Sequence, residues 1–233
     1  MIVYNGVSLE SVAPVKIEDI RVSPVSLEQV ASARAIRGGS DFVRSRDGTR
    51  TVTITFAILT ENPVLRQEYI ENIAQWAKDD REYMLELPQE PNKYLTGVCT
   101  GRPDPSMRQW WESKLRLVFT CFDNPYWTSK AEKSGTCGTA FNVLGDAPPL
   151  MRIERTVSGS AASNQSYALD GRTITFSSIP VGNMVIDLNR QTARVGSSSI
   201  MQYYNVNSRF LIPRTGSQTI TGTGTIKYRE RWK

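Results

Sequence analysis

The chain has 233 residues, which is enough for one large β domain or two small ones, and we expect two. The hydrophobic share of 39% and the mean hydropathy of -0.35 are ordinary for a globular protein, and no run approaches the ~18 apolar residues of a membrane-spanning helix. The net charge of +5 is spread among acidic residues along the chain, which argues against a nucleic-acid-binding protein.

The residue types present narrow the chemistry further. The sequence contains no histidine, the usual general base and a favoured metal ligand, which argues against most hydrolase mechanisms. Cys99, Cys121 and Cys137 form no CxxC pair and are too scattered for a disulfide scaffold or a zinc site, so we interpret them as reduced and mostly buried. The first residues lack the pattern of a secretory signal, so we expect synthesis and folding in the cytoplasm.

Two strands are expected in the first quarter of the chain. Residues 15–22 place Val15 and Ile17 on one face before the alternation slips, and Pro24 ends the segment as at a sheet edge. Residues 49–59 alternate apolar side chains with threonines, the period of a half-buried strand. Because the turn dipeptide Asp47-Gly48 precedes it, we expect a hairpin over residues 42–59. The densest basic segment, residues 44–50, is interpreted as solvated loop charge.

After residue 60 the period changes to that of a helix. Asn62 is a favourable N-cap, and Pro63 fits the first helical position, where its missing N–H is not needed. Apolar residues then recur at spacings of three and four, in a stripe that runs to about Lys78. The members of this stripe are Leu65, Tyr69, Ile73, Trp76 and Ala77. We expect this to be the only long helix.

Further strands are expected at residues 83–87, 94–100 and 114–122, of which the last alternates apolar residues on one face. The next segment, residues 123–139, is rich in turn and small polar residues and is the expected domain junction. Beyond it we expect no helix, a loop over the hydroxyl-rich residues 158–166, and β segments spaced as in a sandwich or barrel. These segments are residues 150–157, 173–176, 183–188, 193–195, 208–212 and 217–229.

Two sets of polar residues invite a functional interpretation. Asp187, at the end of an expected strand, suits either a sugar or metal ligand or an acceptor for turn N–H groups, and we favour the acceptor. Arg102, Asp104 and Glu112 resemble an active-site cluster, but the prolines between them favour a structured loop.

Several segments, in this order and spacing, resemble the distal tail (Dit) proteins of long, non-contractile-tailed phages. The first half contributes RGGSDFVRSRDGTRTVTITFAI, the tryptophan-bearing helix, KYLTGVCTG and LRLVFTCFDNPYW. The second half contributes FNVLGDAPPLMRIE, GRTITFSSIPVGNMVIDLNRQTARV and the terminal NSRFLIPRTGSQTITGTGTIKYRERW. The resemblance covers nearly the whole chain, and the ordered set is more specific than any single segment.

That resemblance implies a mainly β protein with two domains. Residues 1–128 would form a ring-forming belt domain, a β-sandwich with one α-helix, and residues 129–233 a galectin-like β-sandwich. In the family, belt domains close into a hexameric ring around a channel for DNA passage. The ring joins tail-tube protein to the tail-tip hub protein in the virion, after assembly in the host cytoplasm. The chain is too short for an inserted carbohydrate-binding domain, so adsorption is left to a separate receptor-binding protein.

A ring requires an interface between subunits, and two segments are candidates for it. Residues 38–48 join two expected strands and carry the apolar Phe42 and Val43 beside charged residues such as Arg44. A hairpin tip that is buried in a neighbouring subunit would explain why apolar and charged residues occur together there. A tip folded onto its own domain is the alternative. Trp110 and Trp111 are neighbours, so either one is exposed as an interface anchor or the backbone turns and both are buried.

The family is not enzymatic, so we predict no catalytic residues, cofactor, metal or membrane contact. A carbohydrate-binding module of a phage or bacterial surface system is the alternative function, since galectin-like sandwiches bind sugars. Trp232 is the only tryptophan after the junction, which weakens the sugar-binding alternative. A cell-wall glycosidase would need two carboxylates about 5–10 Å apart across a cleft, and the sequence contains no motif for that arrangement.

Overall fold

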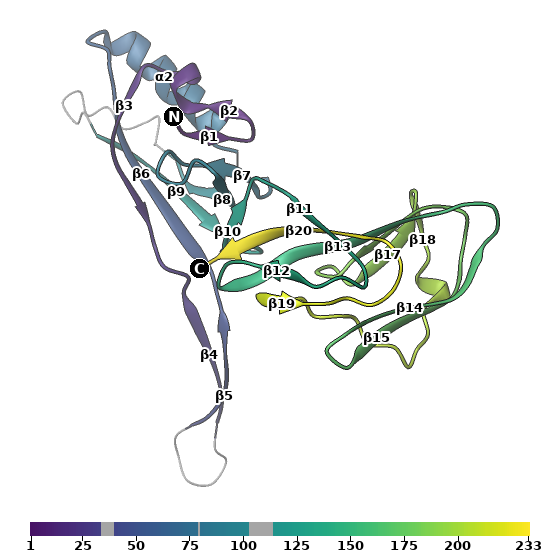
Figure 1. Cartoon of the computed structure of the whole chain (residues 1–233). Helices are drawn as coiled ribbons and strands as arrows, with labels where there is room; N and C mark the ends of the chain where they lie inside the picture. The colour runs from purple at the N-terminus through teal and green to yellow at the C-terminus, as the bar shows by residue number, and fades with distance from the viewer. Residues whose placement is uncertain (34–39, 79, 103–113) are drawn as a thin grey trace. The chain divides into compact units, whose positions relative to one another are not determined.

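The computed structural model describes residues 1–33, 40–78, 80–102 and 114–233, with only the backbone described at residues 29–33 and 40–46 (Figure 1). Over these residues the chain is mainly β with one long helix. It separates into two compact units, Met1–Trp127 together with Lys233, and Thr128–Trp232, and each is described by itself. Strand β10 (Trp127–Ser129) spans the division between them.

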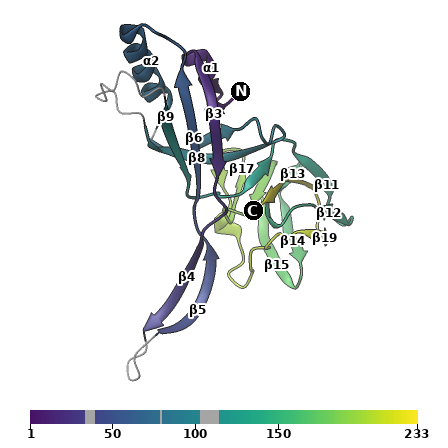
Figure 2. The same cartoon turned by 90° about the vertical axis from the view of Figure 1, so that its left-hand side faces the viewer.

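The N-terminal unit is built on an antiparallel sheet with the order β3-β6-β9-β8-β7-β1-β2. The C-terminal end of helix α2 packs on this sheet, where the ring of Trp76 lies 6.2 Å from that of Phe119 in β9, and the short helix α1 lies against α2 (Figure 2). The elements are β1 (Val3–Tyr4), β2 (Val7–Ser8), α1 (Leu9–Val12), β3 (Val15–Val22), β4 (Leu27–Ala33), β5 (Ser40–Asp47), β6 (Arg50–Ile58), α2 (Pro63–Trp76), β7 (Tyr83–Glu86), β8 (Lys93–Gly101) and β9 (Leu115–Cys121).

Strand β6 is the centre of this unit. Val52, Ile54 and Phe56 are fully buried, which confirms the alternation expected for residues 49–59. The neighbouring strand β3 contains a bulge, because Ile17 pairs with Phe56 and Asp19 with Thr55, leaving an extra residue between them. A bulge inserts one residue and shifts the alternation, which is the physical reason for the slip in the pattern of residues 15–22.

The expected hairpin over residues 42–59 is wrong. Strand β5 pairs with β4, and the chain then continues through Gly48 into β6, which pairs with β3 and β9. Residues 40–47 are therefore strand and not loop. The interpretation of residues 44–50 as solvated charge also fails at its end, since Arg50 begins β6 with only 2% of its surface exposed. Local turn chemistry was outweighed by pairing with strands distant in sequence.

Helix α2 begins as expected. The side chain of Asn62 accepts hydrogen bonds from the backbone N–H groups of Val64 and Leu65, and Pro63 occupies the first turn. The expected apolar stripe is correct in the second half of the helix, where Ile73 and Trp76 are buried, and wrong at Leu65, which is 40% exposed. The apolar stripe begins before the part of the helix that packs against the rest of the unit.

An aromatic cluster attaches the helix to the sheet. The ring of Tyr4 lies 5.6 Å from that of Trp76 and 4.8 Å from that of Phe119, and the Trp76 indole N–H donates to the carbonyl of Val7. Edge contacts of this kind add to the free energy of burial. The Tyr4 hydroxyl donates to the carbonyl oxygens of Lys78 and Gly97, and burial raises the pKa of Tyr4.

The C-terminal unit is a β-sandwich. One antiparallel layer has the order β18-β17-β16-β13-β20-β11, and the pairs β14–β15 and β12–β19 supply the rest. Side chains from both parts, among them Ile153, Tyr167, Phe176 and Ile186, meet in one core. The elements are β11 (Lys133–Thr136), β12 (Phe141–Val143), β13 (Ala147–Val157), β14 (Ala162–Leu169), β15 (Arg172–Ile179), β16 (Gly182–Asp187), β17 (Thr192–Val195), β18 (Ser198–Ser199), the 3-10 helix η1 (Met201–Tyr203), β19 (Gly216–Gln218) and β20 (Thr225–Trp232).

Two expectations for this unit are wrong. The hydroxyl-rich residues 158–166 include the start of strand β14, because pairing with β15 satisfies its backbone although only Tyr167 and Leu169 are buried. Residues 208–212 are not a strand, yet Leu211 is buried and Phe210 packs against the core. The expected strand at residues 217–229 is divided into β19 and β20.

Candidate assembly interface

Strands β4 and β5 form a two-stranded ribbon that follows directly on β3 and β6 (Figures 1 and 2). Within the described residues, these two strands pair only with each other, so both outer edges of the ribbon are open. An isolated two-stranded hairpin is marginally stable in water, and open strand edges readily pair with another chain. We call β4 and β5 the ribbon and treat it as the candidate interface.

The base of the ribbon is held by backbone hydrogen bonds between the residue that precedes β4 and the residues that follow β5. The N–H of Ser26 donates to the carbonyl of Thr49 at 2.9 Å, and the N–H of Gly48 donates to the carbonyl of Ser26 at 2.7 Å. A β-carbon on Gly48 would lie 2.6 Å from the Ser26 hydroxyl oxygen and 3.0 Å from Cγ of Glu28, so a side chain there would have to displace these two side chains. Gly48 lies in the connection from β5 to β6 and not in a hairpin turn between paired strands.

A charged cluster also closes the base of the ribbon. Asp47, the last residue of β5, accepts a hydrogen bond from the Tyr126 hydroxyl at 2.6 Å and pairs with the Lys233 ammonium at 2.9 Å. The hydrogen bonds from Lys233 and then from Tyr126 lower the pKa of the Asp47 carboxyl. The contacts span 79 and 186 residues of sequence, so no local pattern indicated them.

Three predicted interface residues lie in the ribbon. Phe42 pairs with Ala31 and Arg44 with Val30, so Val43 is the extra residue of a β-bulge. Bulges increase local twist and are common at the edges of sheets. Only the backbone is described at these positions. Trp110 and Trp111 lie outside the described residues, as do Asp104 and Glu112 of the cluster that includes Arg102.

The polar residue singled out in the second half has a structural explanation. The Asp187 carboxylate accepts hydrogen bonds from the N–H groups of Asn189 at 3.0 Å and Arg190 at 2.9 Å, which confirms the turn interpretation.

The cysteines are free thiols, with Cys99 and Cys121 buried and Cys137 partly buried. Burial raises the pKa of Cys121 to about 12, so this thiol is not a ready nucleophile.

The N-terminal unit has a shallow groove beside α2. Its walls lack the carboxylate pair or activated nucleophile that hydrolytic chemistry requires. The residues lining it are Tyr4, Asn5, Val7, Val12, Asn72, Gln75, Trp76 and Lys78. In the part of the chain that the structure describes, no three metal-ligating side chains come together, and no helix is long and apolar enough to cross a bilayer.

Comparison with known proteins finds likeness at the level of structure. No protein-family model and no curated protein sequence matches the chain. The crystal structure of the SPP1 Dit (gp 19.1) protein matches with a TM-score of 0.77 and 16% sequence identity, over 100% of this chain and 98% of that chain. That protein is described as a paradigm of the hub adsorption apparatus in phages that infect Gram-positive bacteria.

Two structures of the phage P2 baseplate in its activated conformation align more loosely, with TM-scores of 0.44 and 0.43 and identities of 9% and 10%. Each alignment covers 94% of this chain and 90% of the other. The SPP1 match alone carries the comparison, because the TM-scores of the other two alignments are below 0.5. The chain therefore has the fold of a phage Dit protein, which is the fold that the ordered sequence segments imply.

Proposed function

We propose that this chain is a structural subunit of a phage tail hub. Its copies form a ring, hexameric by resemblance to the Dit family, at the distal end of the tail. The ring joins tail-tube protein on one side to the tail-tip hub protein on the other and leaves a channel for DNA. The end-to-end match to SPP1 Dit is the observation that carries this proposal.

The ribbon supports the proposal because it supplies an interface of the required kind. A ring needs a heterologous contact, in which one surface of a subunit meets a different surface of the next. The open edges of β4 and β5 offer backbone donors and acceptors that a neighbouring subunit would satisfy. We assign the intersubunit contact to Phe42, Val43 and Arg44 in this ribbon, with Trp110 and Trp111 as further candidates.

The test is the molar mass of the purified chain by light scattering over a range of concentrations, with negative-stain images of the same sample. We expect closed rings of about six subunits, since a heterologous interface that closes generates a ring. The variant Val43→Asp should remain folded and lose the rings, because it places an unpaired charge in the contact. The matched control Val181→Asp places the same charge on an exposed valine of the C-terminal unit, outside the ribbon, and should keep the rings.

A folded monomer that also fails to bind tail-tube protein and hub protein would overturn the tail-hub function. A monomer that binds a glycan would favour the carbohydrate-binding alternative. Rings that survive Val43→Asp would remove the ribbon from the interface and leave the proposed function in place.

A further inference from the structure

The basic excess of the chain belongs to one of its two units. Residues 128–232 contain 12 Lys and Arg against 6 Asp and Glu, a net charge of +6. The other unit contains 16 against 17, a net charge of −1, and together the units make the +5 of the whole chain. Complementary charge steers protein association and fixes its orientation. The C-terminal unit is therefore basic, whereas the N-terminal unit is nearly neutral.

The C-terminal unit has a basic surface along strand β15. The segment after η1 runs beside this strand, with the N–H of Asn205 donating to the carbonyl of Thr175 and the N–H of Arg209 to that of Thr173, both at 2.9 Å. The Arg172 guanidinium donates to the carbonyl of Phe210 at 3.5 Å. These bonds hold exposed arginines from two segments next to each other.

Exposed aliphatic side chains lie among these arginines. Val206 is 90% exposed and Ile212 is 52% exposed. Arg214 pairs with Asp170 at 2.6 Å and keeps 63% of its side chain exposed. Exposed arginine beside exposed aliphatic surface is typical of protein interfaces, in which arginine is enriched. We call the set Arg172, Val206, Arg209, Ile212 and Arg214 the arginine strap.

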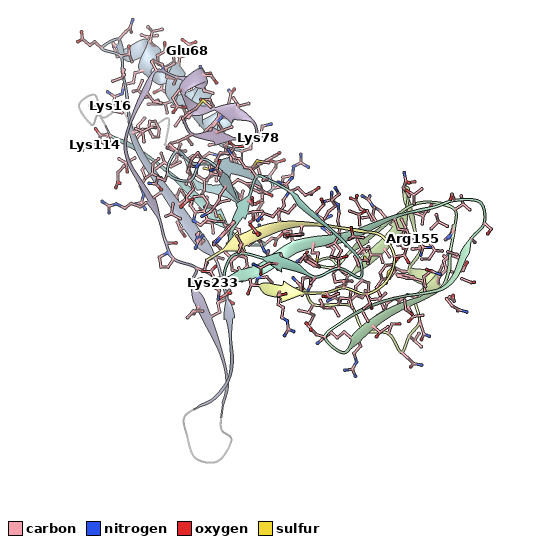
Figure 3. All side chains as sticks on the ribbon, viewed as in Figure 1. Lys16, Glu68, Lys78, Lys114, Arg155 and Lys233 are labelled. Carbon is pink, nitrogen blue, oxygen red and sulfur yellow. The ribbon has the colours of Figure 1, made fainter. Side chains whose placement is uncertain are left out.

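The N-terminal unit has a surface of complementary chemistry where α2 begins. Val64 is 74% exposed, Leu65 is 40% exposed, and Leu59 just before the helix is 60% exposed. Exposed Glu61 precedes the helix, and exposed Glu68 shares a helix face with Val64 and Leu65, four and three residues before it. Half-buried Arg66 lies in the same stretch, so residues 59–68 carry a net charge of −1. Glu68 is seen on α2 in Figure 3. We call the set Leu59, Glu61, Val64, Leu65 and Glu68 the acidic helix end.

We propose that the arginine strap of one copy docks on the acidic helix end of a second copy. The inference rests on the proposed function, because it adds a second heterologous contact between copies to the contact made by the ribbon. Guanidinium groups form strong, directed hydrogen bonds with carboxylates, and the aliphatic side chains of both sets are buried between them. The choice of a second copy follows from charge complementarity, since one chain carries both surfaces.

A charge swap tests the contact. Glu68→Arg and Arg209→Glu, each made alone, should raise the dissociation constant for association between copies at least about tenfold, because each places like charges opposite one another. The double variant carries both reversals in every copy and should return to within about threefold of the original value. Sedimentation velocity over a range of protein concentrations measures all of these.

The controls reverse charges outside the two surfaces. Asp123→Arg and Arg194→Glu are exposed in the same two units and repeat the charge changes at other positions, so association should be unchanged. Circular dichroism of each variant establishes that it is folded. A double variant that associates no better than the single variants overturns the inference.

A second measurement locates the contact directly. Val64→Cys protein is mixed with Ile212→Cys protein and oxidised, so that any disulfide between the new thiols must join two copies. We expect a dimer on a non-reducing gel that appears in the mixture and in neither protein alone. The absence of such a dimer overturns the inference.

The two proposals fail in different ways. If rings form and depend on Val43 but are insensitive to the charge swap, the arginine strap has no role and the tail-hub function stands. If the charge swap behaves as expected but the complex binds neither tail-tube protein nor hub protein, the contact between copies stands and the tail-hub function fails.

Discussion

The N-terminal unit contains a long hairpin, in which β3 pairs with β6 and, further along, β4 pairs with β5. Both halves are antiparallel strand pairs with one bulge, but they have different neighbours. In the first half, β6 lies between β3 and β9, and Val52, Ile54 and Phe56 are fully buried. In the second half, β4 and β5 pair with each other and, so far as the described residues show, with no third strand. Pairing alone leaves a ribbon marginal, so we infer that the second half obtains its stabilisation from another molecule.

The largest expected effect on stability is in the half of the hairpin formed by β3 and β6, where β6 is buried. Phe56→Ala should lower the free energy of unfolding by about 3–5 kcal/mol, because it removes a fully buried aromatic ring and leaves a cavity. Urea denaturation of the N-terminal transition measures the change. Thr55→Ala, on the half-exposed face of the same strand, is the control and should cost less than about 1 kcal/mol. Equal effects at both positions would contradict the assignment of the core face.

A smaller effect is expected where the covering helix begins. Asn62→Ala should cost about 1 kcal/mol, because two backbone N–H groups lose the side-chain oxygen that accepts from them. Thermal unfolding followed by circular dichroism is suitable. Asn62→Asp retains an acceptor and should be close to neutral, whereas an equal loss in both variants would exclude capping as the cause.

The stability of the hairpin where its two halves meet, at Asp47, should depend on pH. Because the folded pKa of Asp47 is lowered, the carboxylate contributes stability above its unfolded pKa, and that contribution is lost as the pH falls through the lower folded pKa. Asp47→Asn should cost at most about 1 kcal/mol at neutral pH and flatten the acid limb of the stability curve. Chemical denaturation at pH 2–7, roughly the range over which carboxyls titrate, measures both. An unchanged acid limb would contradict the assignment.

The smallest effect on folding should come from shortening the open half. Replacing residues 28–46 by an Asn-Gly turn between the paired residues Leu27 and Asp47 should change the free energy of unfolding of the monomer by less than about 1 kcal/mol. The same deletion should abolish the rings seen by light scattering. A strongly destabilised monomer would show that the ribbon belongs to the core of its own unit.

The sequence predicted the elements whose signals are local. The alternation of β6 and the cap at Asn62 were both correct, because a buried face and a helix terminus each depend on neighbouring residues. The hairpin turn expected at Asp47-Gly48 was wrong, because the chain passes there from β5 into β6, and these two strands pair with other strands and not with each other. Leu65 was wrongly placed in the core, because periodicity cannot show where the covering surface ends.

The candidate interface was predicted only in part. Phe42, Val43 and Arg44 were predicted as interface residues in a loop tip, and the structure places them in strand β5 of the ribbon. The cluster of Asp47, Tyr126 and Lys233 was missed, because its members are far apart in sequence. The arginine strap was missed for a similar reason, since its arginines come from two segments that only pairing with β15 brings together.

The sequence by itself determined the mainly β class, the long helix that begins at Pro63 and the lack of histidine side chains, since these follow from composition and short-range periodicity. Only the tertiary structure decided that residues 40–47 pair with β4, that Gly48 lies in a connection and not in a hairpin turn, and that both edges of the ribbon are open among the described residues. Strand pairing is set by contacts between distant residues, and a single sequence does not record which of them meet.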